Sequence, residues 1–244
     1  MSIDIYAINL DRSPDRWERL FQQAVDLDLH LVRVPGVDGL QVPATERVDC
    51  DEQAFSRNNG RTLLPGEYGC YRSHLRALSA FLASEKPVGI IIEDDIILTS
   101  QLIPRVEASF YASPRAEIIK LRNHRLVWFR PVAVSTLGDE IGRAAHGPQG
   151  STACYAVTRS GAAKLAAALA RMEYPWDVAL ERGWATKIDV YSTRENLVLR
   201  ARFKTTIANR AAYKGTKFPW WRRLPTYVIR AAESIRRIRY ALSG

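Results

Sequence analysis

The sequence predicts an α/β fold with a central sheet, because patterns typical of buried strands alternate along the chain with segments of helical periodicity. Residues 3–10 and 88–92 are largely apolar, β-branched runs that suit strands buried on both faces of a sheet. Between them, residues 65–82 repeat apolar side chains at spacings of three and four, as a helix does. With 244 residues, 47% of them hydrophobic, the chain can form one large domain or one domain with a small appendage.

The first strand, at residues 3–10, leads into a turn and a helix. Ser13 is a favourable helix N-cap and Pro14 suits the first turn, so we expect the helix to begin there. A helix start offers free backbone N–H groups, and Arg12 and Arg16 would add positive charge for an anionic ligand. Without other support, an alternative interpretation is equally good: a strand and a helix with no ligand, in which both arginines are solvated.

The next segments are a second strand and a long helix. The strand is expected at residues 30–34, and residues 41–63 are polar and weakly patterned, which favours a loop-rich insertion. The helix at residues 65–82 is apolar on two sides, so we expect it to pack on both. His74 lies within it, and a lone histidine in such a helix is more often a core group than a metal ligand.

Three adjacent carboxylates, Glu93, Asp94 and Asp95, follow the buried strand at residues 88–92. They would emerge at the carboxyl end of that strand, where open α/β sheets bind ligands. Three like charges beside a core repel one another unless a cation or hydrogen-bond donors neutralise them. A divalent ion that carries a phosphate meets this need, and hard oxygen ligands favour Mg²⁺ or Mn²⁺ over Zn²⁺. The alternative is a solvated acidic turn.

The second half of the chain continues the alternation. Strands are expected at residues 117–121, 125–129, 152–157, 187–191 and 197–201, and a helix capped by Ser160 at residues 162–172. The first two of these strands are close enough in sequence to form a hairpin. Residues 131–150 are rich in glycine and lack periodicity, so we expect a mobile loop of the kind that often covers an active site.

The cysteines and the lengths of the apolar segments indicate the cellular compartment in which the protein is expected. Cys50, Cys70 and Cys154 are odd in number, far apart and without the paired spacing of a zinc or redox motif, which favours reduced thiols in a cytoplasmic protein. The first residues lack the basic segment and apolar run of a signal peptide, and no apolar run approaches the roughly 18 residues that span a membrane. We therefore expect neither export nor a transmembrane helix.

The positive charge is concentrated at the C-terminus. The whole chain carries a formal net charge of +9, yet the segment from Arg200 onwards holds twelve basic residues and one acidic residue. We therefore divide the chain into a domain of residues 1–205 and a basic tail of residues 206–244. Aromatic residues alternate with arginines in this tail, and an apolar stripe over residues 228–238 is typical of an amphipathic helix on an anionic membrane. Nucleic-acid binding and docking on its own domain are the alternatives.

Five motifs, taken in order along the chain, resemble those of glycosyltransferase family 25. They are Ile8-Asn9-Leu10-Asp11-Arg12-Ser13-Pro14-Asp15-Arg16, Val37-Asp38-Gly39, Gly66-Glu67-Tyr68-Gly69-Cys70-Tyr71-Arg72-Ser73-His74, Ile92-Glu93-Asp94-Asp95-Ile96 and Gly150-Ser151-Thr152-Ala153-Cys154-Tyr155. The resemblance covers about residues 3–180. This family includes lipooligosaccharide galactosyltransferases of Gram-negative bacteria and, more distantly, collagen galactosyltransferases.

The resemblance implies a GT-A-type nucleotide-sugar-binding fold, in which helices flank a Rossmann-like central sheet, and inverting transfer of a hexose, most often from UDP-galactose. It also implies that Asp95 ligates a Mn²⁺ or Mg²⁺ ion that bridges the donor diphosphate. Glu93 or Asp94 would hold metal-bound water or the donor ribose, and we expect Glu93 to share the ion with Asp95. Such an ion would stabilise the charge that grows on the leaving UDP.

The same resemblance implies further roles for polar residues. Three residues of the opening motif would lie beside the nucleotide, namely Asn9, Arg12 and Arg16. An inverting transfer needs a carboxylate that takes the proton of the acceptor hydroxyl, and Asp177 is the expected base because its Pro-Trp-Asp setting resembles a family segment. The alternative is that Asp177 caps a helix, and Glu181 is its possible substitute as base. His146 and His74 are the candidates for a third metal ligand.

The sequence therefore predicts a metal-dependent glycosyltransferase that moves a hexose, galactose by the resemblance, onto a lipooligosaccharide or lipopolysaccharide core. Its tail would hold it on the anionic cytoplasmic face of a bacterial inner membrane, where a lipid-linked acceptor is presented. A transferase for another nucleotide sugar or a capsular acceptor is the nearest alternative. A non-catalytic protein that binds nucleic acid through the tail is another, although the three carboxylates would repel phosphate in the absence of a metal.

Overall fold

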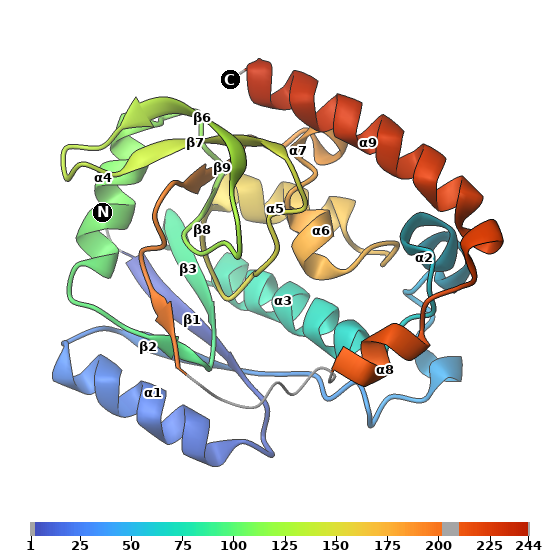
Figure 1. Cartoon of the computed structure of the whole chain (residues 1–244). Helices are drawn as coiled ribbons and strands as arrows, with labels where there is room; N and C mark the ends of the chain where they lie inside the picture. Colours follow the sequence, from blue (N-terminus) through green and yellow to red (C-terminus); the bar gives the residue numbers. More distant parts are fainter. Residues whose placement is uncertain (1–2, 202–209, 244) are drawn as a thin grey trace.

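A central eight-stranded sheet organises the protein, whose computed structural model describes residues 3–201 and 210–243 (Figure 1). The strand order is β2-β1-β3-β8-β5-β9-β7-β6. The strands are β1 (Ile3–Asn9), β2 (Leu31–Pro35), β3 (Val88–Glu93), β5 (Ile118–Lys120), β6 (Val127–Val134), β7 (Glu140–His146), β8 (Cys154–Thr158) and β9 (Val190–Thr193). A separate antiparallel pair consists of β4 (Ile96–Ile97) and β10 (Leu199–Arg200). The predicted α/β class with a central sheet is confirmed.

Helices cover both faces of this sheet. They are α1 (Pro14–Asp26), α2 (Glu52–Asn59), α3 (Pro65–Ala83), α4 (Leu102–Ala112), α5 (Arg159–Ala168), α6 (Trp176–Leu180), α7 (Gly183–Thr186), α8 (Arg210–Gly215) and α9 (Leu224–Leu242). Leu20 of α1 and Val106 of α4 share a core with Ile90, whereas α3, α5 and α6 enclose Ile91 on the opposite face. Successive residues of β3 therefore enter different cores, as predicted for a strand buried on both sides.

The parallel part of the sheet creates the edge on which the polar motifs meet. β1 lies between β2 and β3 and is parallel to both, and Ile8 of β1 is paired with Glu93 of β3. The chain continues from β1 into α1, and α3 delivers the chain to β3. Because the carboxyl ends of β1 and β3 lie at one edge, the polar residues that follow the two strands converge there.

The segment from residue 117 to residue 150 corrects two predictions. β5 and β6 do not form a hairpin, because β9 and β7 lie between them in the sheet. Instead β6 pairs with β7, so residues 131–150 contain most of a two-stranded hairpin and not an irregular mobile loop. β6 is an edge strand with an exposed face, and the middle of β7 consists of a glycine, an arginine and two alanines, so neither has the apolar run by which buried strands are recognised.

Two helical segments also differ in detail from the prediction. The loop-rich stretch at residues 41–63 includes η1 (Ala44–Glu46) and α2, whose N-terminus is capped by Asp51. The helix predicted at residues 162–172 begins earlier and ends earlier, and its cap is Thr158, which accepts a hydrogen bond from the backbone N–H of Gly161, in place of Ser160.

The C-terminal segment is folded against the rest of the protein. After α8, η2 (Trp220–Arg223) leads into α9, which lies along the outer edge of the molecule and contacts β7, α2 and α7 (Figure 1). The basic tail predicted for residues 206–244 therefore docks on its own domain over the described part, and residues 206–209 lie outside the described residues. In the described parts of the chain, no helix has the length and apolar character needed to cross a membrane.

Candidate active site

A cleft opens at the edge where β1 and β3 end, and the space in and above it is about 720 Å³ when the part open to solvent is included. Its walls come from the segments that follow these two strands, from the loop after β2 and from the first turns of α3. Charged residues of both signs line it: Arg12, Arg16, Asp38, Glu93, Asp94, Asp95 and Arg200. Four of the five motifs that the sequence singled out thus contribute to one cleft.

Close backbone contact fixes the wall formed by the loop after β2 and α3. A Cβ atom on Gly39 would lie 1.8 Å from the carbonyl oxygen of Pro65, and one on Gly69 would lie 2.4 Å from that of Val37. The Ser73 hydroxyl joins the same elements, since it accepts a hydrogen bond from the N–H of Val37 at 2.8 Å and donates to the carbonyl of Gly69 at 2.7 Å. Glycine is required where the two backbones touch.

Asp94 is held by residues of the opening motif. Its carboxylate accepts hydrogen bonds from the Asn9 amide at 2.9 Å and from the Arg16 guanidinium at 3.1 Å, and Arg19 donates to its backbone carbonyl. Asp94 is 8% exposed, which excludes the solvated acidic turn considered above. These bonds orient the carboxylate and tie the end of β3 to the start of α1.

Asp95 is paired with an arginine that the sequence did not single out. The Arg200 guanidinium, brought in by β10, donates from two nitrogens to Oδ2 of Asp95, at 2.8 Å from Nε. The other oxygen, Oδ1, is buried and has no hydrogen-bond partner in the described residues. Burial raises the pKa of the Asp95 carboxyl, Arg200 opposes this rise, and the neighbouring negative charge of Glu93 adds to it.

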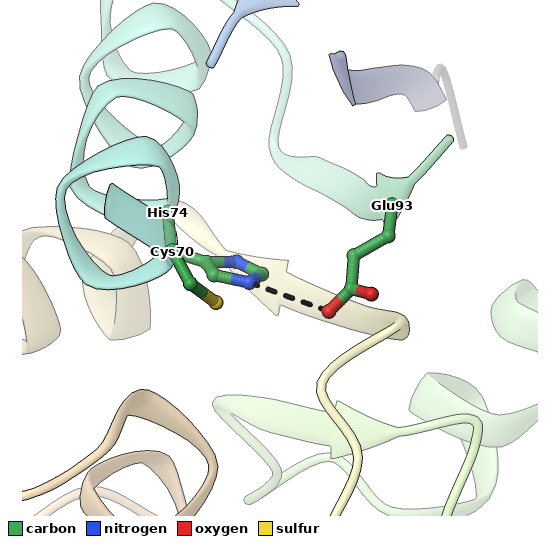
Figure 2. A group of neighbouring side chains, drawn as sticks. All are labelled: Cys70, His74 and Glu93. Atoms are coloured by element: carbon green, nitrogen blue, oxygen red, sulfur yellow. Dashed lines mark ion pairs between the residues drawn. The ribbon is translucent and has the colours of Figure 1, made fainter. Parts of the chain in front are cut away.

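Glu93 points from the end of β3 toward α3, where it faces His74 (Figure 2). Oε1 of Glu93 lies 3.9 Å from Nε2 of His74 and accepts a hydrogen bond of 3.2 Å from Thr152. Burial raises the pKa of Glu93, but His74, Arg200 and Thr152 together lower it by more, so the pKa of Glu93 lies below its usual value whereas that of Asp95 lies above its own. Burial lowers the pKa of His74, which favours a neutral ring.

His74 is fixed by its neighbours. Its ring stacks on Trp176 at 5.0 Å with an angle of 4° between the planes, and Nδ1 lies 3.3 Å from the Tyr155 hydroxyl. Nε2 is buried with no hydrogen-bond partner in the described chain. Cys70, Glu93 and His74 bring one ligand atom each to within 4.8 Å of one another, a second place where a metal ion could be held (Figure 2).

The residues predicted to bind the nucleotide differ in their position, since Arg12 and Arg16 line the cleft whereas Asn9 contacts Asp94. Arg12 forms an ion pair of 2.5 Å with Asp38 and remains 41% exposed, so its guanidinium is accessible to a ligand. Asn9 does not line the cleft directly but positions Asp94. Its own amide oxygen accepts a hydrogen bond of 2.8 Å from Arg33. Asn9 is therefore a positioning residue as the protein stands.

Asp177 does not line the cleft. It lies in the first turn of α6, next to the Trp176 indole, and its carboxylate accepts a hydrogen bond from the N–H of Val178. Asp177 lies close to the cleft residue Cys70. Burial and the charge of Glu93 raise the pKa of the Cys70 thiol, and the charge of Asp177 raises it further. Burial and the charge of Glu181 raise the pKa of Asp177 to about 6.

The structure corrects two further expectations, Glu181 as a substitute base and His146 as a third metal ligand. Glu181 is fully buried, accepts hydrogen bonds from Lys120 at 2.8 Å and Arg237 at 3.0 Å, and cannot serve as a base for a substrate. His146 lies on β7 against the Trp128 ring and is absent from the lining of the cleft, so it is no third metal ligand there. The sequence does not reveal that Glu181 is buried among cations, and it does not reveal the strand order that places His146 away from the cleft.

Sequence reasoning missed two residues of the cleft, Arg200 and Cys70, and also Thr152, which is not part of the lining but donates a hydrogen bond to Glu93. Arg200 was counted only as part of the basic segment, and neither Thr152 nor Cys70 was given a role. For Cys70 a signal existed, because it stands four residues before His74 and therefore on the same helix face. The contact between Arg200 and Asp95 joins residues 105 positions apart and carried no such signal.

Comparison with known proteins identifies the family. Residues 2–180 match the family model described as Glycosyltransferase family 25 (LPS biosynthesis protein). The chain belongs to glycosyltransferase family 25. The matched residues of this family 25 protein extend from β1 to α6 and include every residue of the cleft except Arg200. The predicted membership of this family is confirmed.

Curated relatives match a shorter region. A glycosyltransferase 25 family member of Aedes aegypti is 30% identical over 96 residues, which are 38% of this chain and 16% of the relative. A human protein named inactive glycosyltransferase 25 family member 3 is 30% identical over 108 residues, 43% of this chain and 18% of the relative. A protein of Bos taurus, named probable inactive family member 3, matches to the same extent. The matches thus span less than a fifth of these relatives' lengths.

Proposed function

We propose that this family 25 protein transfers a hexose from a UDP-hexose donor to a saccharide acceptor, with inversion at the anomeric carbon. The observation that carries the proposal is the cleft itself, in which four acidic residues and three arginines meet at the carboxyl ends of parallel strands. Cations suit a diphosphate, and carboxylates suit a sugar hydroxyl or a divalent ion. A GT-A-type donor site is the simplest function for this combination.

The donor diphosphate would bind beside Arg12 and Arg16, which line the cleft. Arg12 is half exposed there, and Arg16 stands at the start of α1, where the partial positive charge of the helix also favours an anion. Arg16 and Asn9 would keep Asp94 oriented toward the ribose. In this arrangement the residues of the opening motif bind the nucleotide partly directly and partly through Asp94.

A Mn²⁺ or Mg²⁺ ion fits the donor atoms near Asp95. The unpartnered Oδ1 of Asp95 is a buried, hard oxygen ligand, and the Glu93 carboxylate is its neighbour in the cleft. When bound, such an ion would stabilise negative charge on the leaving diphosphate. Arg200 would hold Asp95 in place from the opposite oxygen and contribute its own positive charge.

Asp177 is the proposed base for the acceptor hydroxyl. With a pKa of about 6, its carboxyl is mostly ionised at neutral pH and still basic enough to accept a proton. The acceptor would approach from the Cys70 side of the cleft, near which Asp177 lies. His74 and Trp176, stacked on each other, would form a rigid wall between donor and acceptor.

The acceptor proposed is the saccharide core of lipooligosaccharide or lipopolysaccharide, and the donor proposed is UDP-galactose. The description of the matched family, which names LPS biosynthesis, supports this acceptor class. Another nucleotide sugar or a capsular acceptor remains the alternative within the same chemistry. Since two relatives are named inactive, a chain that binds the donor without transferring the sugar is the second candidate.

Calorimetric titration of UDP-galactose and UDP-glucose, with and without Mn²⁺, tests the donor site. We expect Mn²⁺-dependent binding by the wild type and a loss of at least about tenfold in affinity in Asp95→Asn. Asp139→Asn is the matched control, because Asp139 is also a buried aspartate paired with an arginine, Arg105, but lies outside the cleft. Binding that ignores both the ion and Asp95→Asn would contradict the proposal.

Cobalt substitution distinguishes the two places for the ion. An ion at Glu93 and Asp95 has oxygen ligands, so the Co²⁺ absorption spectrum should lack a thiolate charge-transfer band and be the same in Cys70→Ser. A band that disappears in Cys70→Ser would instead place the ion at the cluster of Cys70, His74 and Glu93. Product analysis with radiolabelled UDP-hexose then separates transfer from binding alone.

A further inference from the structure

The C-terminal helix α9 packs with its polar side against the protein. The Thr226 hydroxyl donates to the backbone carbonyl of Arg57 at 2.7 Å, and the buried Arg237 pairs with Glu181 at 3.0 Å. Glu233 accepts hydrogen bonds from Arg182 at 2.7 Å and from the Trp184 indole at 3.1 Å. Polar contacts therefore hold the inner face of the helix, which is the reverse of an ordinary surface helix.

The apolar side of α9 faces outward. Residues at spacings of three and four form one stripe along the whole helix: Leu224, Val228, Ala231, Ile235, Ile238 and Leu242. Val228 is 70% exposed, Leu242 56% and Ile235 52%, although these side chains would ordinarily be covered. Immediately before the stripe, in η2, Trp220 and Trp221 are also exposed. We call Trp220, Trp221 and these six residues the apolar stripe.

Basic residues accompany the stripe. Arg222 and Arg223 follow the two tryptophans, and Arg236 and Arg239 lie on α9 beside the apolar residues. Residues 210–243 contain nine basic residues and one acidic residue, Glu233, which is paired with Arg182 and Arg236. One of the nine, Arg237, is buried on the inner face, so the exposed basic residues still outnumber the single acid. A partner for this surface must therefore offer both an apolar interior and a negatively charged surface.

We propose that the apolar stripe and its flanking arginines bind the surface of an anionic lipid bilayer, with α9 lying parallel to the membrane plane. Apolar side chains would enter the boundary between headgroups and acyl chains, the tryptophans would lie at the headgroup level, and the arginines would contact lipid phosphates. A second protein chain or a nucleic acid fits less well. The flanking positive charge would repel a second copy of the same face. A nucleic acid would bind the arginines through its phosphates but would leave the aliphatic stripe exposed to water.

The position of α9 suits this role. The helix runs along the outer edge of the molecule, so a flat surface can reach its full length (Figure 1). Its inner contacts with β7, α2 and α7 join it to the domain, so membrane binding would hold the whole protein at the lipid surface. This inference does not depend on the proposed transferase activity, because it rests on a different surface.

Vesicle sedimentation of the full chain, without donor or acceptor, tests the proposal. The probes are vesicles of phosphatidylcholine alone and vesicles of phosphatidylcholine mixed with phosphatidylglycerol. We expect binding to the anionic vesicles, a loss of about tenfold or more in partitioning for the double variant V228S/I235S, and a loss of about fivefold for Arg239→Glu. Higher salt should weaken binding.

The double variant V48S/V134S is the matched control, because Val48 is 87% and Val134 60% exposed on other parts of the surface. It should bind vesicles as the wild type does. A blue shift of tryptophan fluorescence on addition of anionic vesicles, lost in W220A/W221A, would give independent support. Failure to bind anionic vesicles, equal loss in the control, or a dimer in sedimentation velocity that V228S/I235S abolishes would each overturn the proposal.

Discussion

The two oxygens of Asp95 have different environments, and this difference can be tested. Oδ2 receives the Arg200 guanidinium, while Oδ1 is buried with no hydrogen-bond partner in the described chain. An unpartnered carboxylate oxygen in a buried place is costly, so the protein gains from any cation or donor that reaches it. Arg200 therefore stabilises the cleft in the absence of a ligand, and an ion would complete the environment of Asp95.

We predict that Arg200→Gln lowers the free energy of unfolding at neutral pH by about 1–2 kcal/mol, since Arg200 is partly exposed and its pairing is partly screened. Mn²⁺ should restore part of this loss, because an ion can replace the missing positive charge beside Asp95. Urea unfolding with and without Mn²⁺ measures both effects. Arg105→Gln, which removes the partner of Asp139 away from the cleft, should be destabilised without rescue by Mn²⁺. Equal rescue of the two variants would contradict the prediction.

The raised pKa of Asp177 bears on the stability of the protein and, if Asp177 is the proposed base, on its activity in the opposite direction. Its pKa is raised from 3.8 to about 6 in the folded protein, chiefly by burial. The folded state therefore holds this proton more tightly than the unfolded state, so the carboxyl makes the protein less stable as pH rises from about 4 to about 6. A catalytic base with a raised pKa commonly has such a cost.

For Asp177→Asn we predict a loss of about a hundredfold or more in kcat, together with a gain of about 1–2 kcal/mol in the free energy of unfolding at pH 7. The acidic limb of the activity profile near pH 6 should also disappear. Rates and urea unfolding measured from pH 4.5 to pH 8 test this prediction. If the variant keeps wild-type activity, another group accepts the proton.

At the scale of the elements, Glu181 joins three parts of the structure. It accepts hydrogen bonds from Lys120 at the end of β5, from Arg237 of α9 and from the backbone N–H groups of Gln149 and Gly150. Burial raises its pKa, but Lys120, Arg237 and these hydrogen bonds lower it by more. The stabilisation is therefore present above the usual pKa of a glutamate and is lost as the pH falls through the lowered one.

We predict that Glu181→Gln destabilises the protein by about 3–5 kcal/mol, because it leaves two buried cations without their counter-charge. It should also loosen α9, which limited proteolysis of the C-terminal segment would detect. Glu233→Gln is the control, since Glu233 also pairs α9 with the domain but is half buried, and it should cost less. Equal effects of the two substitutions would show that Glu181 has no special role.

The elements also show what sequence alone could predict. The buried runs of β1 and β3, and the long apolar helix α3, were predictable because both of their faces are covered and periodicity is then strong. The hairpin of β6 and β7 was missed because β6 is an edge strand and β7 contains glycine, alanine and arginine in place of a β-branched run, so both lack this signal. Within the cleft, the motifs identified most residues, but the contact of Arg200 with Asp95 depends on the tertiary path of the chain.

At the scale of the whole molecule, the C-terminal segment has two different faces. The inner face of α9 supplies Arg237 to the buried Glu181, and Tyr240 of the same helix donates a hydrogen bond to the backbone of Ile188 at 2.8 Å. The outer face carries the apolar stripe. The division into a domain of residues 1–205 and a tail remains a prediction. The contacts of α9 nevertheless indicate that the tail and the domain stabilise each other.

We therefore predict that the full chain unfolds in one cooperative transition and that a chain ending at residue 209 melts at least about 5 °C lower, because it loses these contacts and leaves Lys120 as the remaining cation beside Glu181. Calorimetry of both chains measures this. The control is V228S/I235S, whose changes lie on the outer face of α9 and which should melt at the temperature of the wild type. It shows whether a lower melting temperature comes from losing the inner contacts or from changing the outer face. Two transitions in the full chain would show that α9 is an independent unit, and an unchanged melting temperature in the shortened chain would show that the inner contacts contribute little.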